Sequence, residues 1–119
     1  MPIKNILGLS RLAKPLTSEE GRRILERDHF RCQYCGLDGE SNFENSLIMT
    51  VDFVVPRAKK GRKSPENLVT ACRPCNTIKG RRVFAHLEEA KAYVLARREE
   101  LRTEWEKQLS HRKSHSAAG

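Results

Sequence analysis

Four cysteines, arranged as two Cys-x-x-Cys pairs, constrain this 119-residue chain more than any other feature. The pairs are Cys32/Cys35 and Cys72/Cys75, and 36 residues separate them. Thiolates three residues apart on a tight turn can hold one ion together, and two such turns complete a tetrahedral four-sulfur site. We therefore expect a structural Zn²⁺ ion bound by all four cysteines. Two disulfides or four unrelated thiols are the alternatives, and the absence of a secretory signal argues against disulfides.

A bound ion would supply stability that the apolar residues of the chain supply only in part. Hydrophobic residues make up 38% of a chain long enough for one domain. The binding free energy of a closed structural site is also folding free energy, so it offsets a thin core. No segment approaches the roughly 20 apolar residues of a membrane span, and no apolar signal segment follows the N-terminus. These absences lead us to expect a cytoplasmic protein that does not contact membranes.

The positive charge of the chain is concentrated in one window, residues 57–82. This window has nine basic residues and one acidic residue, Glu66, whereas the rest of the chain carries equal numbers of both signs. A focused basic patch attracts phosphates and steers association with polyanions. We therefore expect the window to bind nucleic acid, although a solvated surface is the simpler alternative. Its basic residues are Arg57, Lys59, Lys60, Arg62, Lys63, Arg73, Lys79, Arg81 and Arg82.

The N-terminal part of the chain predicts a loosely ordered arm followed by a helix. Residues 1–16 form the expected flexible basic arm. The sequence Thr17-Ser18-Glu19-Glu20 fits a capping box, in which Thr17 caps the helix and Glu20 reaches back. The helix should cover about residues 18–28.

The middle of the chain predicts a two-stranded hairpin and a short helix. Residues 37–46 are mostly polar and indicate a loop. Residues 47–55 alternate in the manner of a strand, and residues 68–71 suggest a second, shorter strand. The second cysteine pair then opens a short helix that Gly80 can end. Residues 17–85 together form the expected domain.

A long helix is predicted over residues 86–110, followed by a polar tail over 111–119. Its apolar side chains keep helical spacing from Leu87 through Val94 to Trp105, although Arg98 interrupts the stripe. We expect the stripe to pack on the domain or on a second copy of the chain.

Three polar residues near the cysteine pairs require an explanation. Asp52 interrupts an apolar strand, Asn67 precedes the second strand, and Asn76 directly follows the fourth cysteine. With them, the sequence resembles the zinc-knuckle branch of the HNH endonuclease family over about residues 20–85. The matching segments are Arg27-Asp28, Cys32-Gln33-Tyr34-Cys35-Gly36, Val51-Asp52-Phe53-Val54-Val55-Pro56-Arg57, Pro65-Glu66-Asn67-Leu68-Val69, Cys72-Arg73-Pro74-Cys75-Asn76 and Lys79-Gly80.

The resemblance implies an α+β fold of the ββα-metal (HNH, or His-Me finger) type, flanked by the N-terminal helix and the long C-terminal helix. By position, Asp52 and Asn76 would bind a catalytic divalent ion, Mg²⁺ or Mn²⁺, which favours oxygen ligands. Asn67 would hold the loop opposite the first strand through hydrogen bonds to backbone. The resemblance also implies phosphate contacts for Lys79, Arg81 and Arg82.

One position departs from the family pattern. The family has Asp-His where this chain has Asp52-Phe53, and that histidine is the general base that activates the attacking water. Phenylalanine cannot accept a proton, so the chain binds without cutting, uses another base, or carries an introduced change that disarms it. His29 and His86 are possible substitutes, although neither lies on the strand beside Asp52.

The leading hypothesis is a metal-dependent DNA endonuclease that hydrolyses phosphodiester bonds. The alternative is a catalytically silent zinc module that binds nucleic acid, with DNA as the first expected partner and RNA left open. A third class is a zinc-stapled interaction protein whose long helix, carrying Trp105, docks on a partner. A homodimer formed through this helix is a further expectation.

Overall fold

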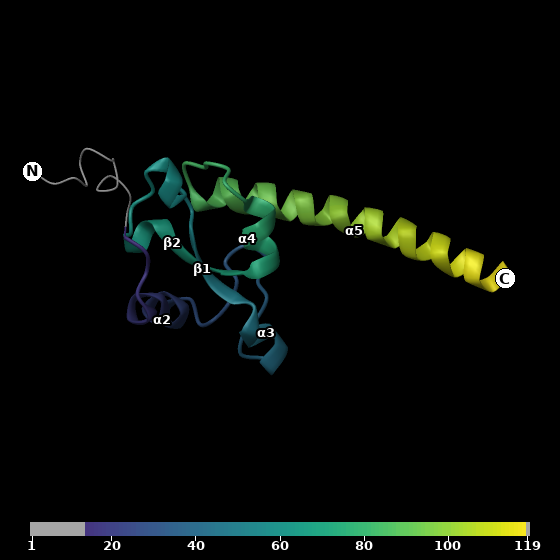
Figure 1. Cartoon of the computed structure of the whole chain (residues 1–119), viewed down its shortest axis with the longest axis horizontal. Helices are drawn as coiled ribbons and strands as arrows, with labels where there is room; N and C mark the ends of the chain where they lie inside the picture. Colours follow the sequence, from purple (N-terminus) through teal and green to yellow (C-terminus); the bar gives the residue numbers. More distant parts are fainter. Residues whose placement is uncertain (1–13, 119) are drawn as a thin grey trace, which may run out of the picture.

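The computed structural model describes residues 14–118, which form an α+β domain with one long projecting helix (Figure 1). Residues 1–13, which include most of the expected arm, lie outside the described residues. The antiparallel sheet contacts α2 and also α4, and α5 packs on α4. The elements are α2 (Ser18–Arg27), α3 (Phe43–Leu47), β1 (Met49–Phe53), the 3-10 turns η2 (Arg57–Lys59) and η3 (Pro65–Asn67), β2 (Leu68–Cys72), α4 (Arg73–Lys79) and α5 (Leu87–Ala118).

The two strands and α4 form the expected ββα unit. Strands β1 and β2 pair antiparallel, with Asp52 opposite Val69 and Phe53 opposite Leu68. Strand β1 is shorter than the expected 47–55, because Ile48 caps α3 and the chain turns away after Phe53. All five residues of β2 are buried, so this strand lies at the centre of the domain.

Helix α2 begins with the predicted capping box. The Thr17 hydroxyl accepts a hydrogen bond from the Glu20 amide at 3.1 Å, and the Glu20 carboxylate accepts one from the Thr17 amide at 2.9 Å. Lys63 lies in the basic loop between β1 and β2, residues 57–65. It also donates to the Glu20 carboxylate at 2.9 Å, which joins this loop to the start of α2. The capping box and the Lys63 contact lower the pKa of Glu20 to about 2.

The end of α2 is tied to β2 by Arg27 and Asp28. Asp28 accepts a hydrogen bond from the Thr70 amide at 2.8 Å, and Arg27 donates to the Leu68 carbonyl at 2.6 Å. Burial opposes ionisation of Asp28, but the hydrogen bonds from Arg27 and Thr70 outweigh it and lower its pKa. The pair therefore holds α2 against the sheet through charge-assisted hydrogen bonds.

Two expectations about irregular segments were wrong. Residues 43–46 of the expected loop and Leu47 of the expected first strand form the short helix α3, because the Asn42 side chain caps it by accepting from the Asn45 amide at 2.8 Å. Residues 111–118, expected to form a polar tail, continue α5. The side chains of residues 111–116 are exposed, so the polar groups of this segment stay solvated in the helix.

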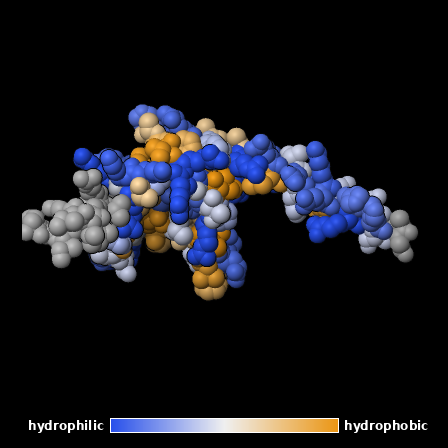
Figure 2. Space-filling model, turned by 45° about the horizontal axis from the view of Figure 1, so that its top comes forward, coloured by the Kyte–Doolittle hydropathy of each residue, from blue (hydrophilic) through white to orange (hydrophobic). Residues whose placement is uncertain are grey.

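The core is small and includes three of the four cysteines. Tyr34, Val54, Ala71, Ala90 and Val94 pack with the cysteines in one buried cluster. Helix α5 contributes its first turns to this core, and its remainder, out of a length of about 48 Å, projects away (Figure 1). The projecting part is largely hydrophilic (Figure 2). None of the helices between residues 14 and 118 has the length and apolar character required to cross a membrane.

Replacement of Gly61 by alanine should destabilise the domain by about 1–3 kcal/mol or more. A Cβ atom at Gly61 would overlap the Val55 carbonyl oxygen, so the backbone of the basic loop would have to move. Thermal or urea unfolding of the metal-loaded protein measures this change. Gly21→Ala is the matched control: its Cβ would meet only Val51 Cγ2 at 4.0 Å, and alanine gains up to about 1 kcal/mol inside a helix. Equal effects of the two substitutions would contradict the argument.

Candidate functional site

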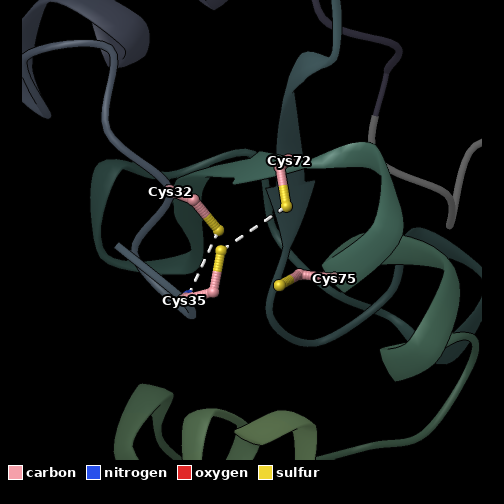
Figure 3. Close-up of side chains that lie close together, drawn as sticks. All are labelled: Cys32, Cys35, Cys72 and Cys75. Carbon is pink, nitrogen blue, oxygen red and sulfur yellow. Dashed lines mark hydrogen bonds between the residues drawn. The ribbon is translucent and has the colours of Figure 1, made fainter. Parts of the chain in front are cut away.

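The four cysteine sulfurs converge on one point between three chain segments (Figure 3). Cys32 and Cys35 lie on the first turn, Cys72 ends β2, and Cys75 lies in the first turn of α4. All four ligand atoms lie within 4.8 Å of one another, and the Cys35 and Cys72 sulfurs are 3.7 Å apart. Gly36 closes the first turn with a φ of 80°, which glycine adopts without strain.

The donor set and its spacing fit a tetrahedral metal ion. Four thiolates at about 2.3 Å from Zn²⁺ would place their sulfurs roughly 3.8 Å apart, close to the separation observed. Without an ion, four thiols this close cannot all ionise. Hydrogen bonds from Cys72 and Cys75 lower the pKa of Cys32, while the hydrogen bond with Cys32 raises the pKa of Cys72 to about 11 and that of Cys75 as well. A divalent cation is the group that permits all four thiolates together.

Asp52 lies buried on the face of β1 that packs toward the first cysteine turn. Its carboxylate accepts a hydrogen bond from the Tyr34 hydroxyl at 2.5 Å, and the Lys79 ammonium lies 3.5 Å from the same oxygen, Oδ2. Burial raises the pKa of Asp52, although the Tyr34 hydrogen bond and the Lys79 charge act in the opposite direction. Burial, followed by the Asp52 charge, likewise raises the pKa of Tyr34. The carboxylate therefore already has two protein partners.

Lys79 does not lie on the surface where a phosphate contact would require it. Its side chain is 0% exposed, and its ammonium donates to the Phe53 carbonyl at 3.1 Å in addition to its contact with Asp52. A buried ammonium must be paired and hydrogen-bonded to be tolerated, and both conditions are met. In this structure Lys79 connects α4 to the end of β1, so the expected phosphate contact needs correction.

The two asparagines occupy different surroundings. Asn67 accepts a hydrogen bond from the Val55 amide at 2.8 Å and donates to the carbonyls of Val55 and Arg62, each at 3.0 Å. These bonds hold both ends of the basic loop together. Asn76 is half-buried on α4 and donates to the Thr50 hydroxyl at 3.3 Å, on the same face of β1 as Asp52.

The basic residues of window 57–82 differ in their exposure. Lys59, Lys60, Arg62, Arg73, Arg81 and Arg82 are exposed, whereas Arg57 and Lys63 are half-buried. The Arg82 guanidinium lies 4.7 Å from the centre of the Tyr93 ring, which positions it by a cation–π contact. Six of the nine predicted cations are therefore presented to solvent, on the basic loop and on or just beyond α4.

The histidines in the described residues are exposed side chains outside β1. His29 follows α2 with a φ of 54°. His86 lines an open cavity of about 490 Å³ together with Val54, Asn67, Glu66 and Glu88. His86 thus shares this cavity with Val54, the residue that follows Phe53 at the end of β1. Phe53 itself is half-buried and carries no titratable group.

Tyr34 belongs to the first cysteine motif, but its contact with Asp52 was not predicted from the sequence. The tyrosine between the first two cysteines places its hydroxyl on Asp52 while its ring fills the core. A buried tyrosine needs a hydrogen-bond partner, and Asp52 is the charged side chain of this strand that could supply it. That combination was a signal available in the sequence.

Removal of the metal should unfold the core, because the free energy of metal binding stabilises the contact of three chain segments. We expect one equivalent of Zn²⁺ per chain, a large fall in melting temperature on treatment with a chelator, and recovery on adding Zn²⁺ back. Circular dichroism during heating measures this. Metal uptake should also release protons and weaken as the pH falls, since the thiols must ionise. A stripped protein that still melts cooperatively at the same temperature would contradict the site, and Cys75→Ser should behave as the stripped chain does.

Substitution Lys79→Met should lower the free energy of unfolding by about 3 kcal/mol, because it leaves the buried Asp52 carboxylate without its cation. Arg81→Met, two residues further along and exposed, is the matched control and should change stability by less than about 0.5 kcal/mol. Urea unfolding of both variants with metal bound measures the difference. Equal stability of the two variants would show that the Asp52–Lys79 contact contributes nothing.

Comparisons with known proteins agree with this geometry. Residues 32–82, which contain both cysteine pairs, the hairpin, the basic loop and α4, match the family model of HNH endonucleases. A segment of 62 residues is 40% identical to the CRISPR-associated endonuclease Cas9 of Corynebacterium diphtheriae. That segment covers 51% of this chain and 5% of the Cas9 protein, so the chain spans a small part of this relative. The domain built on residues 32–82 is therefore similar to HNH endonucleases.

Proposed function

We propose that this chain is a divalent-metal-dependent DNA endonuclease of the HNH type whose hydrolysis is slowed because Phe53 replaces the general base. The observation that carries the proposal is the hairpin itself. Asp52 lies on its first strand next to Phe53, Asn76 of α4 donates to Thr50 of the same strand, and Asn67 holds the loop.

The exposed cations supply binding. Lys59, Lys60 and Arg62 project from a loop held at both ends, and Arg81 and Arg82 follow α4. Phosphate contacts position nucleic acid without reading its sequence, so this surface predicts affinity that falls steeply with salt and no sequence preference of its own. DNA is the proposed partner, and RNA remains an outcome of the binding test.

The proposed catalytic ion would be held by Asp52 and Asn76. One carboxylate and one amide oxygen suit Mg²⁺ or Mn²⁺, which keep several waters. Such an ion supplies charge stabilisation at the scissile phosphate. The fit has a requirement: Asp52 Oδ2 faces Tyr34 and Lys79, so the carboxylate must present its other oxygen, or Lys79 must withdraw.

In this proposal, β1 provides no general base to remove a proton from the attacking water. Phe53 cannot take this proton, and a positioned general base contributes typically 10²–10⁴-fold. His86 is the histidine best placed to substitute, because it shares a cavity with Asn67 and Val54. Hydrolysis without a base on β1 should therefore be slow.

Nicking of supercoiled plasmid with Mg²⁺ or Mn²⁺ tests the proposal. Phe53→His should raise the nicking rate at least about 100-fold over the native chain, because it restores a proton acceptor. Phe53→Leu is the matched control and should leave the rate unchanged. Asp52→Asn, which keeps the shape of the side chain, should abolish nicking in the Phe53→His background, as should EDTA. Plasmid binding by each variant, measured in EDTA at several salt concentrations, separates lost cleavage from lost affinity.

Two results would overturn the proposed slow endonuclease. If the native chain cuts as fast as Phe53→His, the base lies elsewhere, and His86→Gln then identifies or excludes His86. If Phe53→His binds plasmid but remains silent, the divalent site does not function.

A catalytically silent nucleic-acid-binding module is the second candidate, and the Lys79 contact favours it. The ammonium of Lys79 already lies beside the carboxylate that would bind the catalytic ion, and Asp52 is 6% exposed. A cation supplied by the protein itself would compete with a divalent ion for Asp52. Salt-sensitive binding without cleavage by any variant is the result that this candidate predicts.

Two expectations from the sequence stay predictions. Pairing of two copies through α5 is favoured by the exposed Leu101 and Trp105. The cytoplasm remains the location we propose.

A further inference from the structure

Arg98 interrupts the apolar stripe of α5, and the structure gives this residue a partner. It lies one turn after Val94, which is 0% exposed. The Arg98 guanidinium Nη1 lies 3.6 Å from the Cys75 sulfur and is within hydrogen-bond distance for a sulfur acceptor. The side chain is half-buried, so it is held between α5 and the four-cysteine cluster rather than extended into solvent. Arg97, its neighbour, is exposed and pairs with Glu100 at 3.6 Å.

A four-thiolate site creates an electrostatic problem that Arg98 can solve. Four thiolates around a divalent ion leave two uncompensated negative charges in a region where Cys75 is 0% exposed. Buried charge requires a partner, and N–H donors to a metal-bound sulfur are one way to supply it.

The position of Arg98 also links the metal to the long helix. Cys75 belongs to α4, and α4 packs against α5. Ala90 and Val94 bury themselves in the same core that contains Cys32, Cys72 and Cys75. In Figure 3 the green ribbon of α5 passes beside the cluster. The hydrogen bond from Arg98 therefore joins α5 directly to the four-cysteine cluster.

We propose that Arg98 is a positioning residue of the metal site, which donates a hydrogen bond to the metal-bound Cys75 sulfur and couples docking of α5 to the metal. The proposal concerns the structural metal and is independent of whether the chain cuts DNA. Arg98 partly neutralises the four-thiolate charge, and the charged cluster in turn holds α5 at this point.

The test uses the full chain loaded with Co²⁺ as a spectroscopic probe and then with Zn²⁺ in competition with a chelator. We expect Arg98→Met to weaken metal affinity by about 10–100-fold, the usual effect of losing a partner of a metal ligand. The thiolate-to-Co²⁺ charge-transfer band should move to lower energy, because a sulfur without its N–H donor holds its electrons less tightly. Arg97→Met is the matched control, since it removes a cation from the same turn of α5 without touching a sulfur.

The band separates a direct contact from a general loss of stability. Arg98→Lys retains a donor and should restore part of the affinity and part of the band position. Weaker affinity with an unshifted band, or an Arg98→Met variant within twofold of Arg97→Met, would overturn the proposal. If Arg98→Met takes up no metal, Arg98→Lys decides: values intermediate between native and metal-free support the contact, and values equal to those of the native chain overturn it.

Discussion

The convergence of four sulfurs on one point is the constraint on which the rest of this domain depends. It joins the turn of residues 32–36, the end of β2 and the start of α4. A metal ion bound there replaces part of the apolar burial that a larger domain would use. Three side chains described above lie around this point. Tyr34 lies between the first two cysteines and Asn76 follows the fourth, whereas Arg98 of α5 donates to the Cys75 sulfur.

The surroundings of Asp52 set the chemical character of the hairpin. In a site prepared for a hard cation, a carboxylate is expected to keep an open oxygen. Here burial, the Tyr34 hydroxyl and the Lys79 ammonium all act on the same group, and the adjacent residue, Phe53, has no proton to exchange. Similarity to HNH endonucleases and catalytic competence are thus separate properties of this chain. The first follows from the scaffold of residues 32–82, and the second depends on a few side chains at the end of β1.

Local patterns predicted the elements well where one residue type carries the geometry. The capping box placed the start of α2, and cysteine spacing predicted the cluster. Patterns failed where the partner is distant in sequence. Nothing local marks Lys79 as buried, because its partner Asp52 is 27 residues away along the chain and only folding brings them together. In the sequence, Arg98 only interrupts an apolar stripe, because its partner Cys75 is also distant along the chain. Helix α3 was missed although Asn42 offered a cap, since five polar-flanked residues carry no helical period.

The basic loop between the strands has a thermodynamic consequence of its own. Asn67 ties its two ends, Lys63 is bound to α2 through Glu20, and the tight passage at Gly61 leaves its backbone little freedom. Many cationic segments that contact nucleic acid are unstructured and lose conformational entropy when they bind. A loop already held in shape gives up little, so more of its electrostatic attraction remains as affinity. The backbone positions of its basic residues are therefore set before any polyanion binds.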